Sequence, residues 1–256
     1  MATLKEAPVI NPSEARPREL SVPSGAVSSP VRTKIVSTFS VLSVVPVVVL
    51  SVLSVVGLRG SAQTPQLPDP ALDPKVTGEK TAVLAGGCFW GVEAVFEALT
   101  GVKDVVSGYA GGSKASANYA AVSSGTTGHA EAVRITYDPT KISYGQLLKI
   151  FFAVAHDPTQ LNRQGPDFGP QYRSAIFFNG QDQKNVAEGY IRQLNDVNAF
   201  PHRIVTTVVT LDVFHPAESE HQDFVGRNPW HPYVLAHDRP KLERLQKEFP
   251  EILKRK

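Results

Sequence analysis

The residues with the clearest chemical potential are Gly86-Gly87-Cys88-Phe89-Trp90-Gly91, which hold the only cysteine of the chain. The two glycines permit a tight turn from a strand into a helix, so Cys88 is predicted in the first turn of that helix. Free N–H groups and the positive end of the helix dipole stabilise a thiolate there, and we expect a lowered pKa and attack on an electrophile. Phe89 and Trp90 offer an apolar wall for a small apolar group. A second interpretation stays open, in which Cys88 is inert packing at a helix start.

A single cysteine excludes several kinds of site. The chain can form no intrachain disulfide, no CxxC redox pair and no cysteine-rich zinc site. Its histidines have no metal-ligand spacing, and no Walker or dinucleotide phosphate loop is present. The sequence therefore predicts no metal and no bound cofactor.

Hydrophobic periodicity around Cys88 predicts alternating strands and helices. Thr81–Ala85 reads as a short buried strand, and Cys88–Leu99 has the apolar spacing of a helix. His156–Gln171 is dense in Pro, Gly and Asp and is predicted to be a loop. This alternation indicates an α/β or α+β class around one mostly buried sheet. The remaining expected strands are Val102–Gly108, Ala130–Tyr137, Ser174–Phe178 and Val205–Val213, and the remaining helices are Tyr119–Ser123, Ser143–Ala155, Gln181–Asn195, Glu218–Val225 and Lys241–Phe249.

Composition narrows the class of protein. The 256 residues include 26 Lys+Arg and 24 Asp+Glu, a net charge of +2, which argues against a dedicated nucleic-acid binder. With 42% hydrophobic and 20% charged residues, the chain has enough apolar side chains for a folded core.

The N-terminal 62 residues differ from the remainder. Ile35–Gly57 carries no charge and could span a bilayer at about 1.5 Å per residue. It follows a basic flank and precedes the small residues Gly60-Ser61-Ala62, as in an export signal. We expect an extension over 1–62 with a signal peptide or membrane anchor at 35–57, a Pro-rich linker over 63–79 and the working domain over 80–256.

The expected location follows from this segment. A basic flank on the cytoplasmic side places the working domain outside the cytoplasm, either periplasmic or anchored in the cell envelope. Three outcomes stay open: a cleaved signal, a retained anchor, and an uncleaved soluble tail that leaves the protein cytoplasmic.

Further motifs follow Cys88 in a fixed order, and with Gly86–Gly91 they resemble the A-type peptide methionine sulfoxide reductases over about Lys80 to Pro240. The resemblance implies a two-layer α/β fold with a ferredoxin-like core and a mixed sheet. It also implies reduction of the S epimer of methionine sulfoxide, in oxidised proteins, in peptides or as the free amino acid. The motifs are Ser107–Gly112, Asn118-Tyr119, Ser124–Glu131, His156–Pro158, Asp167–Ser174 and Glu220–Gln222.

The same resemblance assigns the reacting groups. Cys88 attacks the sulfoxide, and Glu131 is the acid that protonates its oxygen. Glu131 lies on a strand expected to be buried, where desolvation raises its pKa and keeps it protonated. Tyr119 and Tyr172 are expected to donate hydrogen bonds to the oxygen as its negative charge grows.

The remaining family positions are expected to bind the substrate. Asp167 resembles the acid that helps to hold it, while Phe89 and Trp90 close around the S-methyl group. His221 matches the late Glu-His-Gln element and borders the pocket either as a hydrogen-bonding residue or as a structural one.

The lone cysteine also decides how the enzyme is recycled. Attack leaves Cys88 as a sulfenic acid, which many family members resolve with a second, C-terminal cysteine. This chain departs from that pattern, because Gln222–Ala236 contains no sulfur. We therefore expect an external thiol, from thioredoxin, glutaredoxin or a small molecule, to attack the sulfenic acid directly. As for its oligomeric state, we expect the protein to be a monomer.

Two other functions stay open. Cys88 paired with His129, His156 or His221 would suit a cysteine hydrolase or acyltransferase. A non-catalytic module that binds oxidised methionine peptides is the second alternative.

Overall fold

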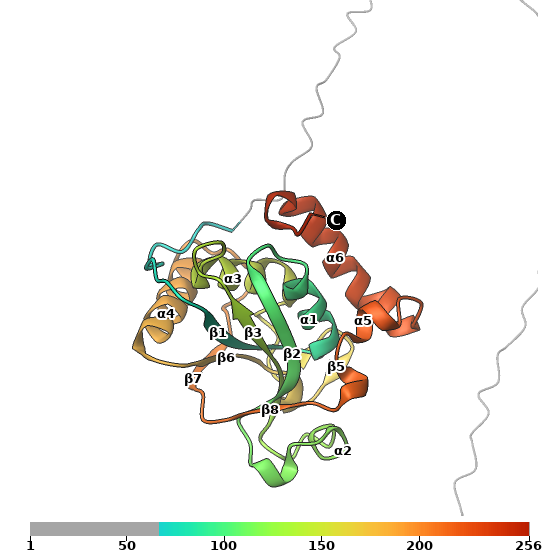
Figure 1. The fold of residues 1–256 in the computed structure, drawn as a ribbon. Coiled ribbons are helices and arrows are strands. Elements are labelled where there is room, and N and C mark those ends of the chain that lie inside the picture. Colours follow the sequence, from blue (N-terminus) through green and yellow to red (C-terminus); the bar gives the residue numbers. More distant parts are fainter. Residues whose placement is uncertain (1–66, 256) are drawn as a thin grey trace, which may run out of the picture. The chain divides into compact units, whose positions relative to one another are not determined.

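One mixed six-stranded sheet organises the computed structural model, which describes residues 67–255 (Figure 1). The strand order is β7-β6-β1-β3-β2-β8, and every neighbouring pair is antiparallel except β6 and β7. The predicted α/β class with a mixed sheet is confirmed. The strands are β1 (Lys80–Gly86), β2 (Val102–Ala110), β3 (Ala130–Tyr137), β6 (Ser174–Phe178), β7 (Thr207–Thr210) and β8 (Phe214–Pro216), and β4 (Arg163–Gln164) pairs with β5 (Asp167–Phe168) in a separate ribbon.

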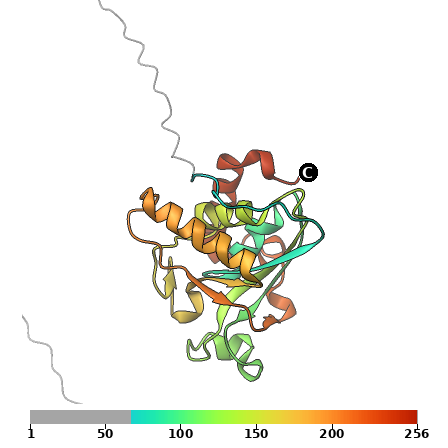
Figure 2. The same ribbon diagram turned by 90° about the vertical axis from the view of Figure 1, so that its left-hand side faces the viewer.

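Helices cover one face of this sheet. Strand β1 alternates, with Ala82 and Leu84 in the large core cluster and Val83 and Ala85 in a smaller, alanine-rich cluster on the other face. The large cluster also contains side chains of five helices, α1, α2, α3, α4 and α6, which places the helical layer on that face (Figure 2). The helices are α1 (Phe89–Glu97), α2 (Tyr119–Val122), α3 (Tyr144–Ile150), α4 (Gln181–Asp196), α5 (Phe224–Arg227) and α6 (Arg239–Glu248).

The turn from β1 into α1 has the predicted form. Gly87 adopts φ +92°, a conformation that favours glycine, and a Cβ there would lie 2.5 Å from Gln164. Cys88 is the N-cap residue of α1, with φ −51° and ψ 123°. The cysteine is therefore fixed where a buried strand of the sheet ends and a core helix begins.

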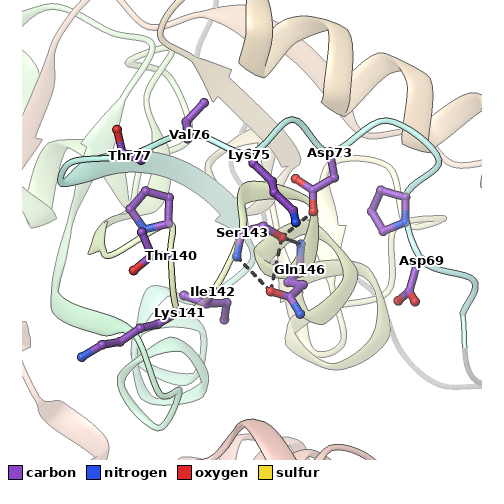
Figure 3. Close-up of a pocket in the computed structure, with 12 residues that line it drawn as sticks. Asp69, Asp73, Lys75, Val76, Thr77, Thr140, Lys141, Ile142, Ser143 and Gln146 are labelled. Carbon is purple, nitrogen blue, oxygen red and sulfur yellow. Dashed lines mark hydrogen bonds between the residues drawn. The ribbon is translucent and has the colours of Figure 1, made fainter.

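Residues 67–79, named the strap from here on, belong to the segment that the sequence predicts to be a linker, and they pack against α3 and α4. Asp73 accepts a hydrogen bond from the backbone N–H of Gly145 at 3.0 Å. It also accepts one from the hydroxyl of Ser143, the N-cap residue of α3 (Figure 3). Tyr190 of α4 donates its hydroxyl proton to the carbonyl of Pro68 at 2.7 Å. Beside these contacts, residues of the strap and residues 139–143 and 146 line a cleft of ≈ 720 Å³.

Several predicted elements differ from the structure. Ser143 is the expected N-cap, with a complete capping box, but α3 ends at Ile150 and one π-helical turn, Phe151–Ala155, completes the segment. The predicted helix Glu218–Val225 is wrong as a single element. Asp223 has a left-handed backbone, φ +47°, which separates the turn Ser219–His221 from α5.

The predicted export signal or anchor at 35–57 and the residues before Leu67 lie outside the described part of the chain. Among residues 67–255, no helix combines the length and the apolar character needed to cross a membrane.

Candidate active site

A small pocket of ≈ 240 Å³ opens at the N-terminus of α1. It brings together seven of the eight residues singled out by sequence, and only His221 is not part of its lining. Two further residues line it that the sequence did not single out. The lining consists of Cys88, Phe89, Trp90, Tyr119, Glu131, Asp167, Tyr172, His231 and Tyr233.

Glu131 reaches the start of α1 from the neighbouring strand. It is the second residue of β3, which pairs with β1, and only 2% of its surface is exposed. Its Oε2 accepts a hydrogen bond from the backbone N–H of Phe89 at 3.1 Å. An N–H in the first turn of a helix has no acceptor within the helix, and here the Glu131 carboxyl supplies one. The hydrogen bond therefore holds the carboxyl group beside Cys88.

Burial raises the pKa of Glu131 to about 8; the Phe89 N–H lowers it, and the charge of Asp167 raises it further. The direction agrees with the prediction. At neutral pH the Glu131 carboxyl therefore holds a proton and can donate it.

The environment of Cys88 contradicts the expected lowered pKa. Burial raises the pKa of the thiol well above its ordinary value, and the negative charges of Glu131 and Asp238 add to the effect. A hydrogen bond from the Trp90 N–H and the charge of Lys241 act in the opposite direction but are weaker. The helix N-terminus is present as predicted, yet desolvation outweighs it because only 8% of Cys88 is exposed. The resting residue is therefore a thiol.

Two phenol hydroxyls complete the polar side of the pocket. Tyr119 is the first residue of α2, and its backbone N–H donates to Glu218 at 2.9 Å, which fixes the start of this short helix. Tyr172 ends the turn Pro170–Tyr172. Burial, and then the charge of Glu131, raises the pKa of both phenols, so both remain hydrogen-bond donors.

The apolar side of the pocket is built on the first turn of α1. Phe89 is 1% exposed, and its ring lies 5.9 Å from that of Tyr109. Trp90 stacks on Phe224, with 3.7 Å between ring centroids and 9° between planes, and it meets the ring of Tyr233 edge-on at 5.8 Å. These contacts hold both rings in one orientation.

Comparison with known proteins identifies the family that shares this arrangement. The family model described as "Peptide methionine sulfoxide reductase" matches residues 80–253. The chain belongs to the peptide methionine sulfoxide reductase family. It is an enzyme of the MsrA type.

Individual relatives agree with this assignment. The chain is 58% identical over 193 residues to "Peptide methionine sulfoxide reductase MsrA 2" of Synechocystis sp., covering 73% of this chain and 90% of that one. Among solved structures, Mxr1 from Saccharomyces cerevisiae in reduced form matches with a TM-score of 0.54 and 32% identity, over 62% of this chain and 90% of that one. Methionine sulfoxide reductase A of Corynebacterium diphtheriae matches with a TM-score of 0.53 and 33% identity, over 66% and 87%.

This member of the reductase family closes its pocket with residues 229–238, named the tail from here on. Tyr233 donates its hydroxyl proton to Oδ2 of Asp167, and His231 also lines the pocket. Sequence reasoning missed both residues, because the tail has no helical or strand period. The available signal was its aromatic content, with Trp230, His231 and Tyr233 in a stretch that carries no sulfur.

His221 lies behind the pocket of this reductase. Its Nδ1 accepts a hydrogen bond from the Trp90 indole at 3.3 Å, and its ring lies 4.3 Å from that of Tyr119. The ring of His129 forms hydrogen bonds with the backbone of Gly112 and Ser113. The ring of His156 forms hydrogen bonds with the backbone of Phe151 and the hydroxyl of Ser174. The three histidines named for a hydrolase are therefore not in the pocket lining. Within residues 67–255, no group of three or more His, Cys, Asp and Glu side chains is placed to hold a metal ion.

The tail also buries a carboxyl group against α1. Asp238 is 0% exposed, and within the described part of the chain neither of its oxygens accepts a hydrogen bond of good geometry. The Nζ of Lys241 lies 3.5 Å from Oδ1. A Cβ on Gly91 would lie 2.1 Å from the same oxygen. The absence of a side chain at Gly91, the last glycine of the Cys88 motif, therefore leaves room for the Asp238 carboxyl.

Proposed function

We propose that the protein reduces methionine-S-sulfoxide, in polypeptides or free, to methionine, with Cys88 as nucleophile and Glu131 as acid. The observation that supports this most directly is the shared pocket, which is lined by the Cys88 thiol, a buried carboxyl and two phenols. Repair of oxidised methionine residues in proteins follows from this activity.

The proposed chemical step conserves protons. The Cys88 sulfur bonds to the electrophilic sulfoxide sulfur while Glu131 transfers its proton to the sulfoxide oxygen. The thiol proton of Cys88 passes to Glu131. The hydroxyl group then moves to the Cys88 sulfur as the bond between the two sulfurs breaks, which releases methionine and leaves Cys88 as a sulfenic acid.

The other lining residues have binding roles in this proposal. Tyr119 and Tyr172 donate hydrogen bonds to the oxygen as its charge grows, in the manner of an oxyanion hole. Phe89 and Trp90 enclose the S-methyl group. Asp167 holds the substrate on the side closed by Tyr233.

Recycling requires an external thiol in this proposal, since Cys88 is the only cysteine of the chain. A thiol attacks the sulfenic acid, which releases water and forms a mixed disulfide, and a second thiol then returns Cys88 to the thiol form. A dithiol protein of the thioredoxin type supplies both sulfurs. Glutaredoxin or a small thiol could provide the same chemistry.

An epimer-resolved turnover assay tests this function. A peptide that contains both epimers of methionine sulfoxide is incubated with the full chain and excess dithiothreitol. We expect methionine to form from the S epimer alone, and no product with Cys88→Ser. Turnover that persists in Cys88→Ser, or equal consumption of both epimers, would refute the proposal.

A further inference from the structure

The phenol of Tyr119 needs support from outside its own helix. It is assigned above to the sulfoxide oxygen, yet 37% of the residue is exposed and α2 has only four residues. A helix of this length is not stable alone in water, because its few hydrogen bonds do not offset the entropy lost on ordering it. The place of the phenol in the pocket therefore depends on contacts with other parts of the chain.

Glu218, just after strand β8, supplies such a contact with both oxygens of its carboxyl group. Oε1 accepts a hydrogen bond from the backbone N–H of Tyr119 at 2.9 Å, and Oε2 accepts one from the hydroxyl of Tyr109 at 2.8 Å. The first N–H of a helix has no acceptor within the helix, so Glu218 satisfies a donor that α2 cannot. The carboxyl group thus forms a bridge between Tyr119 and Tyr109, named the Glu218 bridge from here on.

The Tyr109 end of the Glu218 bridge is buried beside the reacting groups. Tyr109 is 0% exposed in β2 and pairs with Glu131 of β3. Residues that face each other in an antiparallel pair project their side chains to the same face of the sheet. The Tyr109 ring also lies 5.9 Å from that of Phe89. The bridge therefore connects Tyr119 to the strand pair that carries the proposed acid.

The backbone around Glu218 is itself fixed to β2. The side chain of Gln222 accepts a hydrogen bond from the Ser107 N–H at 2.9 Å and donates one to the Ser107 carbonyl at 3.0 Å. The Ala217 N–H donates to the same carbonyl at 2.9 Å. Glu218 lies between these two anchors, so its carboxyl group is presented from a segment that is held on both sides.

The Glu218 carboxyl is ionised in this setting. Desolvation raises its pKa, but hydrogen bonds from the Tyr119 N–H, from its own N–H and from the Tyr109 hydroxyl outweigh desolvation, and the net result is a pKa below the ordinary value. Hydrogen bonds to an ionised acceptor are roughly twice as strong as those between neutral groups. The two bonds of the bridge are therefore of the strong kind.

We propose that Glu218 is a positioning residue for sulfoxide reduction, whose carboxylate holds Tyr119 so that the phenol reaches the sulfoxide oxygen. This inference rests on the proposed function of Tyr119 as a hydrogen-bond donor. Glu218 does not line the pocket, so it acts through Tyr119 and not on the substrate. A donor that is oriented before the reaction needs no rearrangement as negative charge grows on the oxygen.

A double-mutant cycle on the chemical step tests the proposal. The full chain is mixed with saturating methionine-S-sulfoxide without thiol, and the rate constant for the first methionine is measured where every variant is folded. We expect Tyr119→Phe, which removes the donor, to lower this rate constant about 10²-fold. Glu218→Ala, which removes both bonds of the bridge, should lower it about tenfold.

The decisive value is the effect of Glu218→Ala in the Tyr119→Phe chain. If Glu218 acts only by holding the phenol, its loss costs nothing once the phenol hydroxyl is absent, so the double variant should match Tyr119→Phe alone. A further tenfold loss in the double variant would overturn the proposal, because Glu218 would then act through Tyr109 or through general stability. A Tyr119→Phe chain as fast as the natural one would overturn it as well.

Two more variants separate the bridge from a simple effect of charge. Glu218→Gln keeps an oxygen for the Tyr119 N–H and an N–H for the Tyr109 oxygen, so it should retain most of the rate that Glu218→Ala loses. Glu220→Ala is the matched control, since it removes an exposed carboxylate that accepts its hydrogen bond from Ser219. Equal losses in Glu218→Ala, Glu218→Gln and Glu220→Ala would overturn the bridge.

Amide hydrogen exchange, followed by NMR without substrate, separates failure of the bridge from failure of the proposed function. Glu218→Ala should speed exchange of the Tyr119 N–H, which loses its acceptor, and Glu220→Ala should not. Unchanged exchange in Glu218→Ala would overturn the bridge. Faster exchange together with a natural chain that forms no methionine would instead refute the reaction proposed for Cys88.

Discussion

The strap and the tail lie near opposite ends of the described chain and have different physical characters. The strap contains no helix or strand, whereas the tail ends in a π-helical segment, Val234–Asp238, that leads into α6. The strap satisfies its polar groups against α3 and α4, and none of residues 67–79 lines the Cys88 pocket. The tail lines the pocket through His231 and Tyr233 and buries Asp238 without a well-formed hydrogen bond. The difference indicates that the strap stabilises the domain, while the tail gives up local stability to complete the site.

The pocket shows the same unfavourable burial. A carboxyl group with a pKa of about 8 and a thiol with a raised pKa are both held out of water at the start of α1. Such groups destabilise the folded state but place a proton donor beside a nucleophile. If this comparison is correct, substitutions in the pocket and tail change activity, and substitutions in the strap change stability.

Glu131→Gln should have the largest effect on activity. Glutamine keeps the size and the acceptor for the Phe89 N–H but cannot protonate the sulfoxide oxygen, so we expect kcat/KM to fall about 10²–10⁴-fold. Glu93→Gln is the matched control, because Glu93 is 1% exposed, has a pKa raised by burial to about 7, and does not line the pocket. Similar losses in both variants would show that buried acids of α1 and β3 act through stability.

The same variant should be more stable than the natural chain at alkaline pH. The pKa of Glu131 is about 8 in the folded state, against an ordinary value of 4.5. Between pH 4.5 and pH 8 the folded state therefore binds a proton at Glu131 that the unfolded state releases. Stability therefore falls as the pH rises from 4.5 to 8 in the natural chain and falls less in Glu131→Gln. Denaturant unfolding at pH 5 and pH 8 measures this, and an advantage for Glu131→Gln that shrinks with rising pH would contradict the pKa direction.

Asp73→Ala should affect stability and not chemistry. It removes the acceptor for the Gly145 N–H and the Ser143 hydroxyl, and we expect a loss of about 1–3 kcal/mol in the free energy of unfolding with kcat/KM retained. Lys75→Ala changes an exposed residue of the same strap and should leave stability nearly unchanged. A drop in kcat/KM at a temperature where Asp73→Ala is fully folded would break the comparison between strap and tail.

Tyr233→Phe should give the smallest change, and it should affect substrate binding. The substitution removes only the hydroxyl that donates to Asp167, for a cost of about 1 kcal/mol, or roughly fivefold in kcat/KM. We expect a higher KM with an unchanged melting temperature. A lower melting temperature with unchanged KM would assign the tail to stability as well.

Periodic segments were predictable from sequence. Strands β3 and β6 have the predicted bounds, and β1 and α4 agree to within one residue at each end. These segments were predictable because their two-residue and 3.6-residue hydrophobic periods reflect burial directly. Strand β8 has three residues and was missed, since such a short strand depends on pairing with β2.

The site was predictable only in part. Cys88 and Glu131 belong to separate motifs that the sheet brings together, as the resemblance implied. Tyr233 was missed because its contact with Asp167 spans 66 positions and has no local pattern. The direction of the Cys88 pKa depends on tertiary burial, which a helix-terminus argument does not include.

The most direct test of the account is a single turnover without any thiol. The fully reduced chain is mixed with an excess of methionine-S-sulfoxide, methionine is counted, and dimedone is added to trap sulfenic acid before mass spectrometry. The account predicts one methionine per chain and a dimedone adduct on Cys88 alone. Continued release of methionine beyond one per chain, or product formed while Cys88 remains an unmodified thiol, would contradict it.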